Sequence, residues 1–314
     1  MFNKAVFIGI NESQISPEYW KRIDSVIKKR VHLNADAPEI KKELSDTDCL
    51  LVGFGILIDK DYIDSAPKLK YIGVLATAYD KVDTAHSRNR SISVCNVAGY
   101  STEAVAEFAF AAILEHIRNL EKSKQLGREG LNEPTGYFGS EIKNKVFGVL
   151  GTGKIGSRVA EIAQGFGADV RYWSRNRKPQ LESKGIKYEE ADKFIPICDF
   201  LSLNFSTTKE TKNFLNKSRV QKLKSGVTVI QAVSLETVDV DAMEERLNKN
   251  DISFIFENSE ETPQDIFKRL SQHKNCIVYP ITAFATKESM ALRQKIFVEN
   301  IENFLKGSPT NVVN

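Results

Sequence analysis

The segment VFGVLGTGKIGSRVA (residues 146–160) constrains the fold more than any other part of the chain. In it, Gly151, Gly153 and Gly156 have the spacing G-x-G-x-x-G, between an apolar strand-like run and a helix-like run. The first glycine permits a tight turn, the second lets the backbone approach a pyrophosphate, and the third lets the helix pack close to the strand. The motif therefore predicts an α/β fold with a dinucleotide site. A glycine-rich turn without a ligand is the alternative.

The rest of the chain alternates short apolar runs with amphipathic segments, as expected for βαβ units and parallel sheets. Helices are expected from Pro17 to about Val31, over 101–124, and over 287–307, where Gly-Ser-Pro stops the last one. The looser segment 125–145 is expected to cross between domains. Strands are expected at 4–10, 49–55, 71–75, 92–97, 146–150, 169–174, 199–205, 227–233, 252–256 and 276–280.

Length and composition indicate an ordinary globular protein of two domains. The chain has 314 residues, 41% of them hydrophobic, and a net charge of 44 − 41 = +3, which argues against nucleic acid or an anionic membrane as partner. No apolar run approaches the ~18 residues of a membrane span. The amino-terminal apolar run continues into polar sequence, so we expect a first strand, no signal peptide and a cytoplasmic protein. The four scattered cysteines are expected to be buried, reduced thiols, and no metal site is expected.

The sequence after the strand DVRYWS (169–174) bears on the choice of cofactor. NAD-binding domains often carry an acid here for the ribose 2′-hydroxyl. This chain reads SRNRKP (174–179), with no acid and three cations. Ser174 and Arg175 could bind a 2′-phosphate, whereas a carboxylate would repel one. The charge pattern favours NADP over NAD, with a solvated basic turn as the alternative.

Four segments, in order, one of them containing the glycine motif, resemble the D-2-hydroxyacid dehydrogenase family, in particular its glyoxylate and hydroxypyruvate reductase branch. They are APKLKYIGVLATAYDKVD (66–83), ISVCNVAGYSTEAVAEFAFAAIL (92–114), GVLGTGKIGSRVAEIAQGFGADVRYWSR (148–175) and KETKNFLNKSRVQKLKSGVTVIQA (209–232). The resemblance implies two Rossmann-like domains, one of them flavodoxin-like, with parallel sheets and a cleft between them. Residues 1–99 and 286–314 would form the substrate domain, and 100–285 the NAD(P)-binding domain.

The resemblance also implies a homodimer joined largely through the cofactor domain. The very apolar helix expected over 101–124 fits this, because its apolar faces exceed one stripe, although burial in the domain core explains it too. Family members reduce a 2-keto acid with a nicotinamide cofactor. A histidine donates the proton, an acid orients that histidine, and an arginine binds the substrate carboxylate.

The positions of these three catalytic residues are changed in this chain. VIQAVSLETVD (229–239) has Ser234 where the family has arginine, and FENSEETP (256–263) has Thr262 where the family has glutamate. Glu261 is one residue away, so a shifted loop could restore a carboxylate. YPI has Ile281 where the family has histidine. These replacements predict loss of ordinary 2-keto acid reduction, because losing a general acid typically costs ~10²–10⁴ in rate.

The cofactor positions are better kept. The helix amino terminus after Gly153 offers unpaired N–H groups to phosphates. Residues 204–206 replace the family's His/Asn-x-Pro, residues 231–233 keep backbone carbonyls, and Glu257 stands where the family has an aspartate near the nicotinamide amide. The expected cofactor contacts are Gly151, Gly153, Lys154, Ile155, Gly156, Ser174, Arg175, Asn204, Phe205, Ser206, Thr211, Ala232, Val233 and Glu257.

Three functions remain open from the sequence. The first is an oxidoreductase that uses substitute residues, for which Tyr79, Lys81, Tyr137 and Lys143 are weak candidates and ordinary surface loop residues are the alternative reading. The second, which we favour, is a protein that binds NAD(P) without family-type turnover, such as a sensor, regulatory subunit or scaffold. The third is a non-redox enzyme, such as a lyase, with no supporting residue. The four histidines, His32, His86, His116 and His273, are expected to be structural or surface residues.

Overall fold

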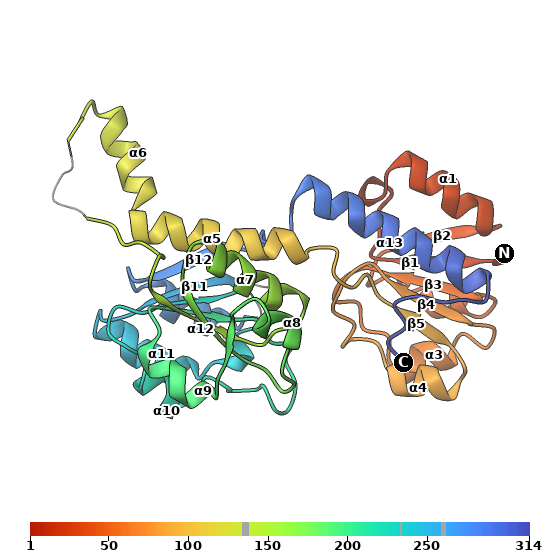
Figure 1. Ribbon diagram of the computed structural model, residues 1–314. Coiled ribbons are helices and arrows are strands. Elements are labelled where there is room, and N and C mark those ends of the chain that lie inside the picture. The colour runs from red at the N-terminus through yellow and green to blue at the C-terminus, as the bar shows by residue number, and fades with distance from the viewer. Residues whose placement is uncertain (134–137, 233, 259–261) are drawn as a thin grey trace. The chain divides into compact units, whose positions relative to one another are not determined.

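The chain folds into two compact α/β units in a computed structural model that describes residues 1–133, 138–232, 234–258 and 262–314 (Figure 1). Unit 1 comprises Met1–Ser101 and Thr286–Asn314, and unit 2 comprises Thr102–Ala285. Unit 1 is therefore discontinuous in sequence, because its last helix follows the whole of unit 2.

Unit 1 is built on a parallel five-stranded sheet with the order β2-β1-β3-β4-β5. This is the flavodoxin-like order of a doubly wound sheet. Its strands are β1 Ala5–Ile8, β2 Arg30–Leu33, β3 Cys49–Val52, β4 Tyr71–Val74 and β5 Ser93–Cys95. Its helices are α1 Pro17–Val26, α2 Ile40–Leu44, α3 Lys60–Asp64, α4 Thr84–Asn89 and α13 Lys287–Leu305.

The two faces of this sheet bury separate apolar clusters because successive strand residues point to opposite sides. Phe7 and Tyr71 pack with Phe297 of α13 on one face, together with residues of α1. Val6 and Ile72 face the other side, toward α2 and α3. The last helix of the chain thus completes the core of the first domain.

Unit 2 has a parallel seven-stranded sheet with the order β12-β11-β10-β9-β6-β7-β8. The strand order reverses between β6 and β9, which is the point where dinucleotides bind in Rossmann folds. Its strands are β6 Val146–Leu150, β7 Asp169–Trp173, β8 Lys187–Tyr188, β9 Phe200–Leu203, β10 Thr228–Gln231, β11 Ser253–Asn258 and β12 Cys276–Pro280. Its helices are α5 Thr102–Arg118, α6 Leu120–Arg128, α7 Lys154–Gly165, α8 Pro179–Glu182, α9 Ala191–Phe194, α10 Lys217–Gln221, α11 Val240–Asn248 and α12 Gln264–Ser271.

Helices cover both faces of the seven-stranded sheet. On one face α5 and α7 bury Phe110 and Val159 against Phe147 of β6. On the other face α9 and α11 bury Phe194 and Met243, together with Leu270 of α12. The predicted α/β class with two Rossmann-like parallel sheets is confirmed.

The helix expected from Pro17 to Val31 is shorter than predicted. It ends at Val26, and Arg30–Leu33 form β2, which pairs with β1 in the register Ala5↔Arg30. Amphipathic spacing favours a helix here, but the edge of the sheet offers a full ladder of backbone hydrogen bonds that overrides the local preference. The two-residue strand β8 also had no distinct sequence signal.

The single helix expected over 101–124 is two helices. Asn119 has φ = 47°, a left-handed conformation that ends α5 at Arg118, and α6 then continues to Arg128, inside the expected crossing. The buried apolar residues of α5 pack in the core of unit 2. Burial within the unit therefore accounts for the apolar character of this helix, without a partner subunit.

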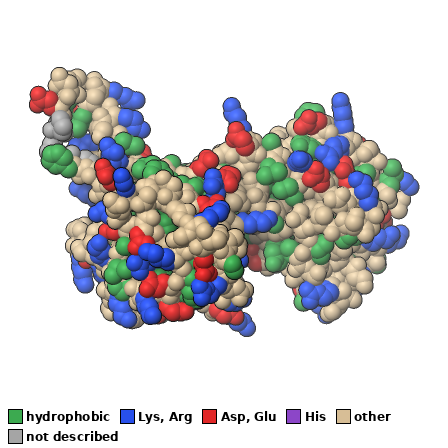
Figure 2. Space-filling view, in the orientation of Figure 1, with side chains coloured by type: hydrophobic (Ala, Val, Ile, Leu, Met, Phe, Trp, Pro, Cys, Tyr) green, Lys and Arg blue, Asp and Glu red, His purple; other side chains and the backbone are tan. Residues whose placement is uncertain are grey.

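Lys and Arg side chains are interspersed with Asp and Glu over the face shown in Figure 2. All four cysteines are buried and free, as expected. Within the described ranges, no helix is both long and apolar enough to span a membrane. In the same ranges, no group of three or more His, Cys, Asp or Glu side chains is placed to hold a metal ion.

Candidate nucleotide-binding site

The glycine loop connects β6 to α7 at the topological switch point. Gly151 has φ = 85°, and a Cβ there would lie 2.8 Å from Phe205 Cδ1 and 3.0 Å from Asn204 O. A Cβ on Gly156 would lie 1.9 Å from the carbonyl oxygen of Gly151. Both positions exclude a side chain for packing reasons, so the loop has its tight turn and close helix contact. Asn204 and Phe205 follow β9, the strand beside β6, and both lie against Gly151. They are among the predicted cofactor contacts.

Gly153 differs from the other two glycines in having open space in front of it. A Cβ added to it would meet no atom within 4 Å, although Gly153 is the N-cap residue of the twelve-residue helix α7. No side chain caps this helix end. The backbone N–H groups and the positive end of the helix dipole can therefore receive a phosphate directly. The loop fits the pyrophosphate of a dinucleotide.

The end of β7 is joined to this loop by a hydroxyl relay. Thr152 Oγ1 donates to Ser174 Oγ at 2.8 Å, and Ser174 Oγ donates to the carbonyl oxygen of Asn176 at 2.6 Å. Both hydroxyls are buried. The O–H donor of Ser174 is thus used inside the chain, where it fixes the turn that leads to Arg175.

The cations of this turn differ in their availability. Arg175 contacts Glu210 at 3.5 Å, and both side chains are about 70% exposed (71% and 69%). Arg177 makes a close ion pair with Glu182 and lies over the ring of Tyr188, with its guanidinium carbon 5.1 Å from the centroid. Arg175 is therefore the arginine of this turn whose charge is free to meet an anionic ligand at little cost.

The segment after β9 provides one wall of the site. Phe205 is 7% exposed and packs against Phe214 at 4.7 Å between ring centroids, so it is a core residue at the rim. Ser206 is exposed, and its carbonyl oxygen accepts from Thr211 Oγ1 at 2.7 Å. Thr211 therefore closes the turn after β9.

Of the two cofactor contacts predicted at the end of β10, the structure describes one. Ala232 follows the strand, and Val233 lies outside the described residues. Ser234 accepts from the N–H of Glu236 at 3.4 Å as N-cap of the short helix Leu235–Thr237, and its carbonyl oxygen accepts from Gln231 Nε2. Ser234 carries no charge and serves as a local turn residue.

The ends of β11 and β12 are tied to each other by Glu257. Its Oε1 accepts from the backbone N–H groups of Thr282 and Ala283, both at 2.7 Å. Ile281 precedes these residues and is 40% exposed. Thr262 is half-buried before Pro263, and the alternative carboxylate Glu261 lies outside the described residues. The position predicted to have lost its histidine thus carries an exposed hydrocarbon on a loop held by a carboxylate.

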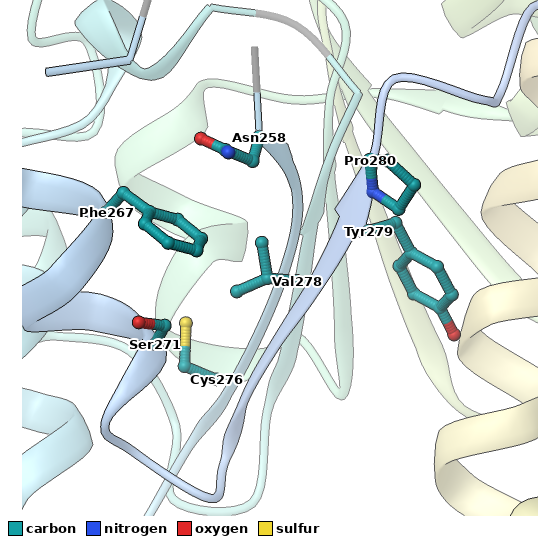
Figure 3. A pocket seen from close by; sticks show the side chains of 7 residues that line it. All are labelled: Asn258, Phe267, Ser271, Cys276, Val278, Tyr279 and Pro280. Carbon is teal, nitrogen blue, oxygen red and sulfur yellow. The ribbon is translucent and has the colours of Figure 1, made fainter. Parts of the chain in front are cut away.

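A hollow of about 460 Å³ lies beside β12 and is lined by Val278, Cys276 and five further side chains. Figure 3 shows how these side chains lie. Phe267 and Ser271 come from α12, and Tyr279 points to the opposite side of the strand. There Tyr279 donates to Glu115 of α5, and its pKa is raised by burial and by that carboxylate. Burial raises the pKa of the Cys276 thiol to about 12, so this cysteine is no nucleophile at neutral pH.

Of the four weak substitute candidates, two lie in unit 1, after β4. Tyr79 is 39% exposed and Lys81 is exposed, while the Lys81 carbonyl oxygen accepts from Ile58 N–H at 2.8 Å. Lys143 of unit 2 is exposed, and Tyr137 lies outside the described residues. All of the described candidates are loop side chains open to solvent.

The histidines make local contacts. His86 Nε2 lies 2.8 Å from Asp64 Oδ1, and His116 Nε2 lies 2.9 Å from Ser253 Oγ. His32 Nδ1 lies 3.3 Å from the carbonyl oxygen of Ile10, and His273 Nε2 lies 3.8 Å from Glu244. Burial lowers the pKa of His116. These contacts agree with the structural roles expected from the sequence.

Known proteins resemble the chain over nearly its whole length. Residues 110–283 match the family described as "D-isomer specific 2-hydroxyacid dehydrogenase, NAD binding domain". The hydroxypyruvate reductase of Blautia hydrogenotrophica is 29% identical over 306 residues, or 94% of each chain. The glyoxylate reductase of Thermococcus litoralis is 30% identical over 286 residues, or 87% of this chain and 85% of that one.

Solved structures share the fold. The D-lactate dehydrogenase from Aquifex aeolicus, complexed with NAD and lactic acid, aligns with a TM-score of 0.85 at 24% identity, covering 97% of this chain and 96% of that one. An acyclic imino acid reductase in complex with NADPH and D-Arg aligns with a TM-score of 0.84 at 24% identity, covering 99% and 100%. With the glycine loop, the switch point and the matched NAD-binding domain taken together, the chain belongs to the D-isomer specific 2-hydroxyacid dehydrogenase family and is an NAD(P)-binding protein of that type.

Proposed function

We propose that this protein binds a nicotinamide dinucleotide and does not catalyse the ordinary reduction of 2-keto acids. One observation carries the proposal. The strand β12 ends at Pro280, and the next residue, where the family resemblance places the proton donor, is Ile281 with an exposed side chain. A hydrocarbon cannot give a proton to a developing alkoxide.

The proposal assigns binding of the nucleotide to unit 2 and binding of a small ligand to unit 1. The loop from Gly151 to Gly156 turns the amino end of α7 toward the phosphates, and Lys154 and Ile155 open that helix. A bound nicotinamide would supply or accept a hydride. The chain's own part is to hold the phosphates by backbone N–H groups, with Asn204 and Ala232 at the neighbouring strand ends.

For the cofactor we propose NADP in preference to NAD. The O–H donor of Ser174 is engaged with Asn176, so the ligand-facing charge at this position is that of Arg175. A guanidinium can bind a 2′-phosphate through two parallel hydrogen bonds. The Arg175→Ala variant should lose affinity for NADPH, and keep its affinity for NADH.

The missing arginine supports the loss of activity independently of Ile281. Ser234 is an uncharged turn residue, so it cannot bind a carboxylate as an arginine does. One carboxylate oxygen of Glu257 accepts hydrogen bonds from the backbone N–H groups of residues 282 and 283, and these bonds position the loop. The arginine that the reaction needs is therefore replaced by a residue whose hydroxyl makes a local turn contact.

The test is a fluorescence titration of the purified protein with NADPH and NADH, followed by a panel of 2-keto acids. We expect saturable nucleotide binding, and no oxidation of the bound cofactor. Rapid oxidation by a small keto acid would overturn the proposed loss of activity. If neither nucleotide bound, the assignment of the glycine loop itself would be wrong.

A second candidate function is an active reductase that uses substitute residues. It is favoured by the names of the relatives, which are a hydroxypyruvate reductase and several glyoxylate reductases. Tyr79 could donate a proton and Lys81 could bind an acid in that case. Turnover that falls in Tyr79→Phe and Lys81→Ala, with nucleotide binding unchanged, would support it. Turnover that survives both changes would remove these two residues from consideration.

We also propose a cytoplasmic homodimer, with α6 covered by a second copy. No residue of α6 is buried, and large apolar side chains nearby are exposed: Leu120 at 42%, Leu131 at 49% and Phe138 at 88%. Sedimentation velocity should show a dimer, and Phe138→Lys together with Leu131→Lys should shift it toward monomer. A monomer at all concentrations in the unchanged protein would contradict this assembly.

A further inference from the structure

The last residues of the chain lie along β5, the edge strand of the unit 1 sheet (Figure 1). We call residues 310–314 the tail. Val313 N–H donates to the carbonyl oxygen of Val94 at 2.9 Å. The Asn314 side chain extends this pairing, since its Oδ1 accepts from Val94 N–H at 2.8 Å and its Nδ2 donates to the carbonyl oxygen of Ile92 at 2.6 Å. The tail therefore pairs backbone groups that an open sheet edge leaves free.

The tail is joined to α13 through Asn300. This residue is 1% exposed, and its Oδ1 accepts from Thr310 Oγ1 at 2.9 Å and from Asn311 Nδ2 at 2.8 Å. Its Nδ2 donates to the carbonyl oxygen of Asn96 at 2.8 Å. A buried amide used in this way is held in one orientation, because turning it over would place like groups against each other. Asn300 therefore connects the tail to the segment that follows β5.

Asn96 is the residue at which the tail meets the loop after β4. Its backbone N–H donates to the carbonyl oxygen of Asn311 at 3.2 Å, and its own carbonyl oxygen accepts from Asn300. Asn96 is 4% exposed, and its Nδ2 donates to the carbonyl oxygen of Thr77 at 2.7 Å. The tail and α13 thus hold both backbone groups of Asn96, and its side chain holds Thr77, the first residue of the loop 77–81.

The contact between Asn96 and Thr77 depends on the fixed backbone of Asn96. The Oδ1 atom of Asn96 is shielded from solvent and has no hydrogen-bond partner. A buried acceptor without a partner is unfavourable, so it offsets much of the gain from the bond that Nδ2 makes. The position of this side chain is therefore determined by the backbone contacts with Asn311 and Asn300, and loss of those contacts would free Thr77.

The loop is tied at both ends, and exposed side chains lie between the ties. Thr77 is the tie at one end, and at the other Ile58 N–H donates to the carbonyl oxygen of Lys81 at 2.8 Å. Val82 N–H donates to the carbonyl oxygen of Tyr79 at 3.0 Å. Tyr79 is 39% exposed and Lys81 is exposed. A shift of either tie would move these side chains, and the amides of Ile58 and Val82 report on the loop.

We infer that the tail is a strap that positions the loop 77–81 through Asn300 and Asn96. Docking of the tail on β5 and order in the loop rise and fall together, because the two buried amides connect them in series. All of these residues belong to unit 1. The strap acts on the segment that carries Tyr79 and Lys81.

The strap has a consequence for any small ligand that unit 1 binds, and this consequence alone rests on the proposed function. Coupling between two sites is reciprocal. A ligand that prefers the ordered loop would therefore tighten the tail on β5, and a docked tail would raise the affinity for that ligand by the same factor. Removal of the tail from β5 would lower it.

The experiment is amide hydrogen exchange, followed by NMR, on the full-length protein without nucleotide or other ligand. Asn314→Ala removes two hydrogen bonds that the tail makes with residues 92 and 94, not with the loop. We expect faster exchange at Val313, and exchange at Val82 and Ile58 that is faster by about fivefold, the factor to which one typical hydrogen bond corresponds. Exchange at Phe7 in β1 should stay unchanged, whereas a general loss of stability in unit 1 would accelerate it too.

Asn96→Ala interrupts the same connection at a later point. It removes the donor to Thr77 and leaves the backbone contacts of residue 96 in place. We expect faster exchange at Val82 while Val313 stays protected. The double variant Asn314→Ala/Asn96→Ala should exchange no faster at Val82 than Asn96→Ala alone, because both changes act through one connection.

The matched control is Asn34→Ala, which replaces an exposed asparagine of the same unit and should leave all of these rates unchanged. Unchanged exchange at Val82 in Asn314→Ala, equal acceleration at Phe7, or additive effects in the double variant would each overturn the inference. An NADPH titration of the same samples tests the proposed function separately, because a loss of nucleotide binding leaves the exchange rates of unit 1 to be measured.

Discussion

The carboxylate of Glu257 accepts a hydrogen bond from the backbone N–H of Thr282 at 2.7 Å. The same oxygen accepts a second one from Ala283, so the last residues of β11 hold the loop that follows β12. Glu257 also pairs in register with Tyr279 in the sheet. The loop that carries Ile281 is therefore fixed by hydrogen bonds to the Glu257 carboxylate, and no local sequence pattern predicts them.

Replacing Glu257 with alanine should loosen this loop. Hydrogen bonds to a charged group contribute about 1.5–3 kcal/mol each, and two backbone N–H groups lose their acceptor. We expect amide hydrogen exchange at Thr282 and Ala283 to accelerate, with little change elsewhere in unit 2. The matched control is Glu236→Ala, whose side chain is exposed. Unchanged exchange at both amides would show that the loop is held by other contacts.

The glycine loop gives a paired test on one helix. Gly156→Ala would place a Cβ 1.9 Å from the Gly151 carbonyl oxygen, so the backbone must move, and we expect nucleotide affinity to fall by about tenfold or more. Gly165→Ala meets no atom within 4 Å, and should leave affinity unchanged while stabilising α7 by up to about 1 kcal/mol. Equal NADPH affinity in the two variants, measured by fluorescence titration, would contradict the close-packing argument.

Arg246 of α11 should be a major contributor to the stability of unit 2. Its guanidinium, 4% exposed, donates to the carbonyl oxygens of Val220 and Leu223 and pairs with Asp251 at 2.8 Å. Arg246→Met would leave these acceptors unsatisfied, and we expect a loss of about 3 kcal/mol.

The measurement is urea unfolding followed by the fluorescence of Trp173, in a Trp20→Phe background so that only unit 2 reports. Lys268→Met, at an exposed position of α12, is the control and should shift the unfolding free energy by less than about 0.5 kcal/mol. A similar loss in both variants would show that the buried network contributes nothing specific.

His116 should make the stability of unit 2 depend on pH. Burial lowers the pKa of His116 in the folded state, whereas the unfolded chain has the ordinary value near 6.5. The unfolded state therefore binds the proton more tightly. The free energy of unfolding has its highest value, as far as His116 determines it, above about pH 6.5, and it decreases as the pH drops below that value. The His116→Gln variant should flatten this dependence between pH 8 and 5 in the same urea assay. An identical slope in both proteins would rule out His116 as its source.

The fold was largely predictable because the signals that specify it are local. Apolar runs and the glycine spacing at Gly151, Gly153 and Gly156 lie within short stretches, and the structure places them on β6 and α7. The predicted end of α1 was wrong because Arg30 pairs with Ala5, which lies in a strand 25 residues earlier in the chain. Likewise, an asparagine in a left-handed conformation, Asn119, divides the predicted long helix, and an apolar pattern does not encode this break.

The site was predictable in its residue types and less so in their contacts. Ser174 was expected to face the cofactor, but its donor bonds to Asn176, and only the three-dimensional turn reveals this. The clamp by Glu257 joins residues 25 and 26 positions apart.

Because α13, the last helix, packs in unit 1, it determines the order in which the two units can fold during synthesis. Unit 2 is continuous, so it can fold as soon as its last strand has left the ribosome. The sheet of unit 1 must wait, with the face that carries Phe7 and Tyr71 only partly covered by α1, until Phe297 and Ile301 arrive about two hundred residues after β5. The first domain to be made is thus the last to be completed, and during synthesis its sheet keeps one apolar face incompletely covered.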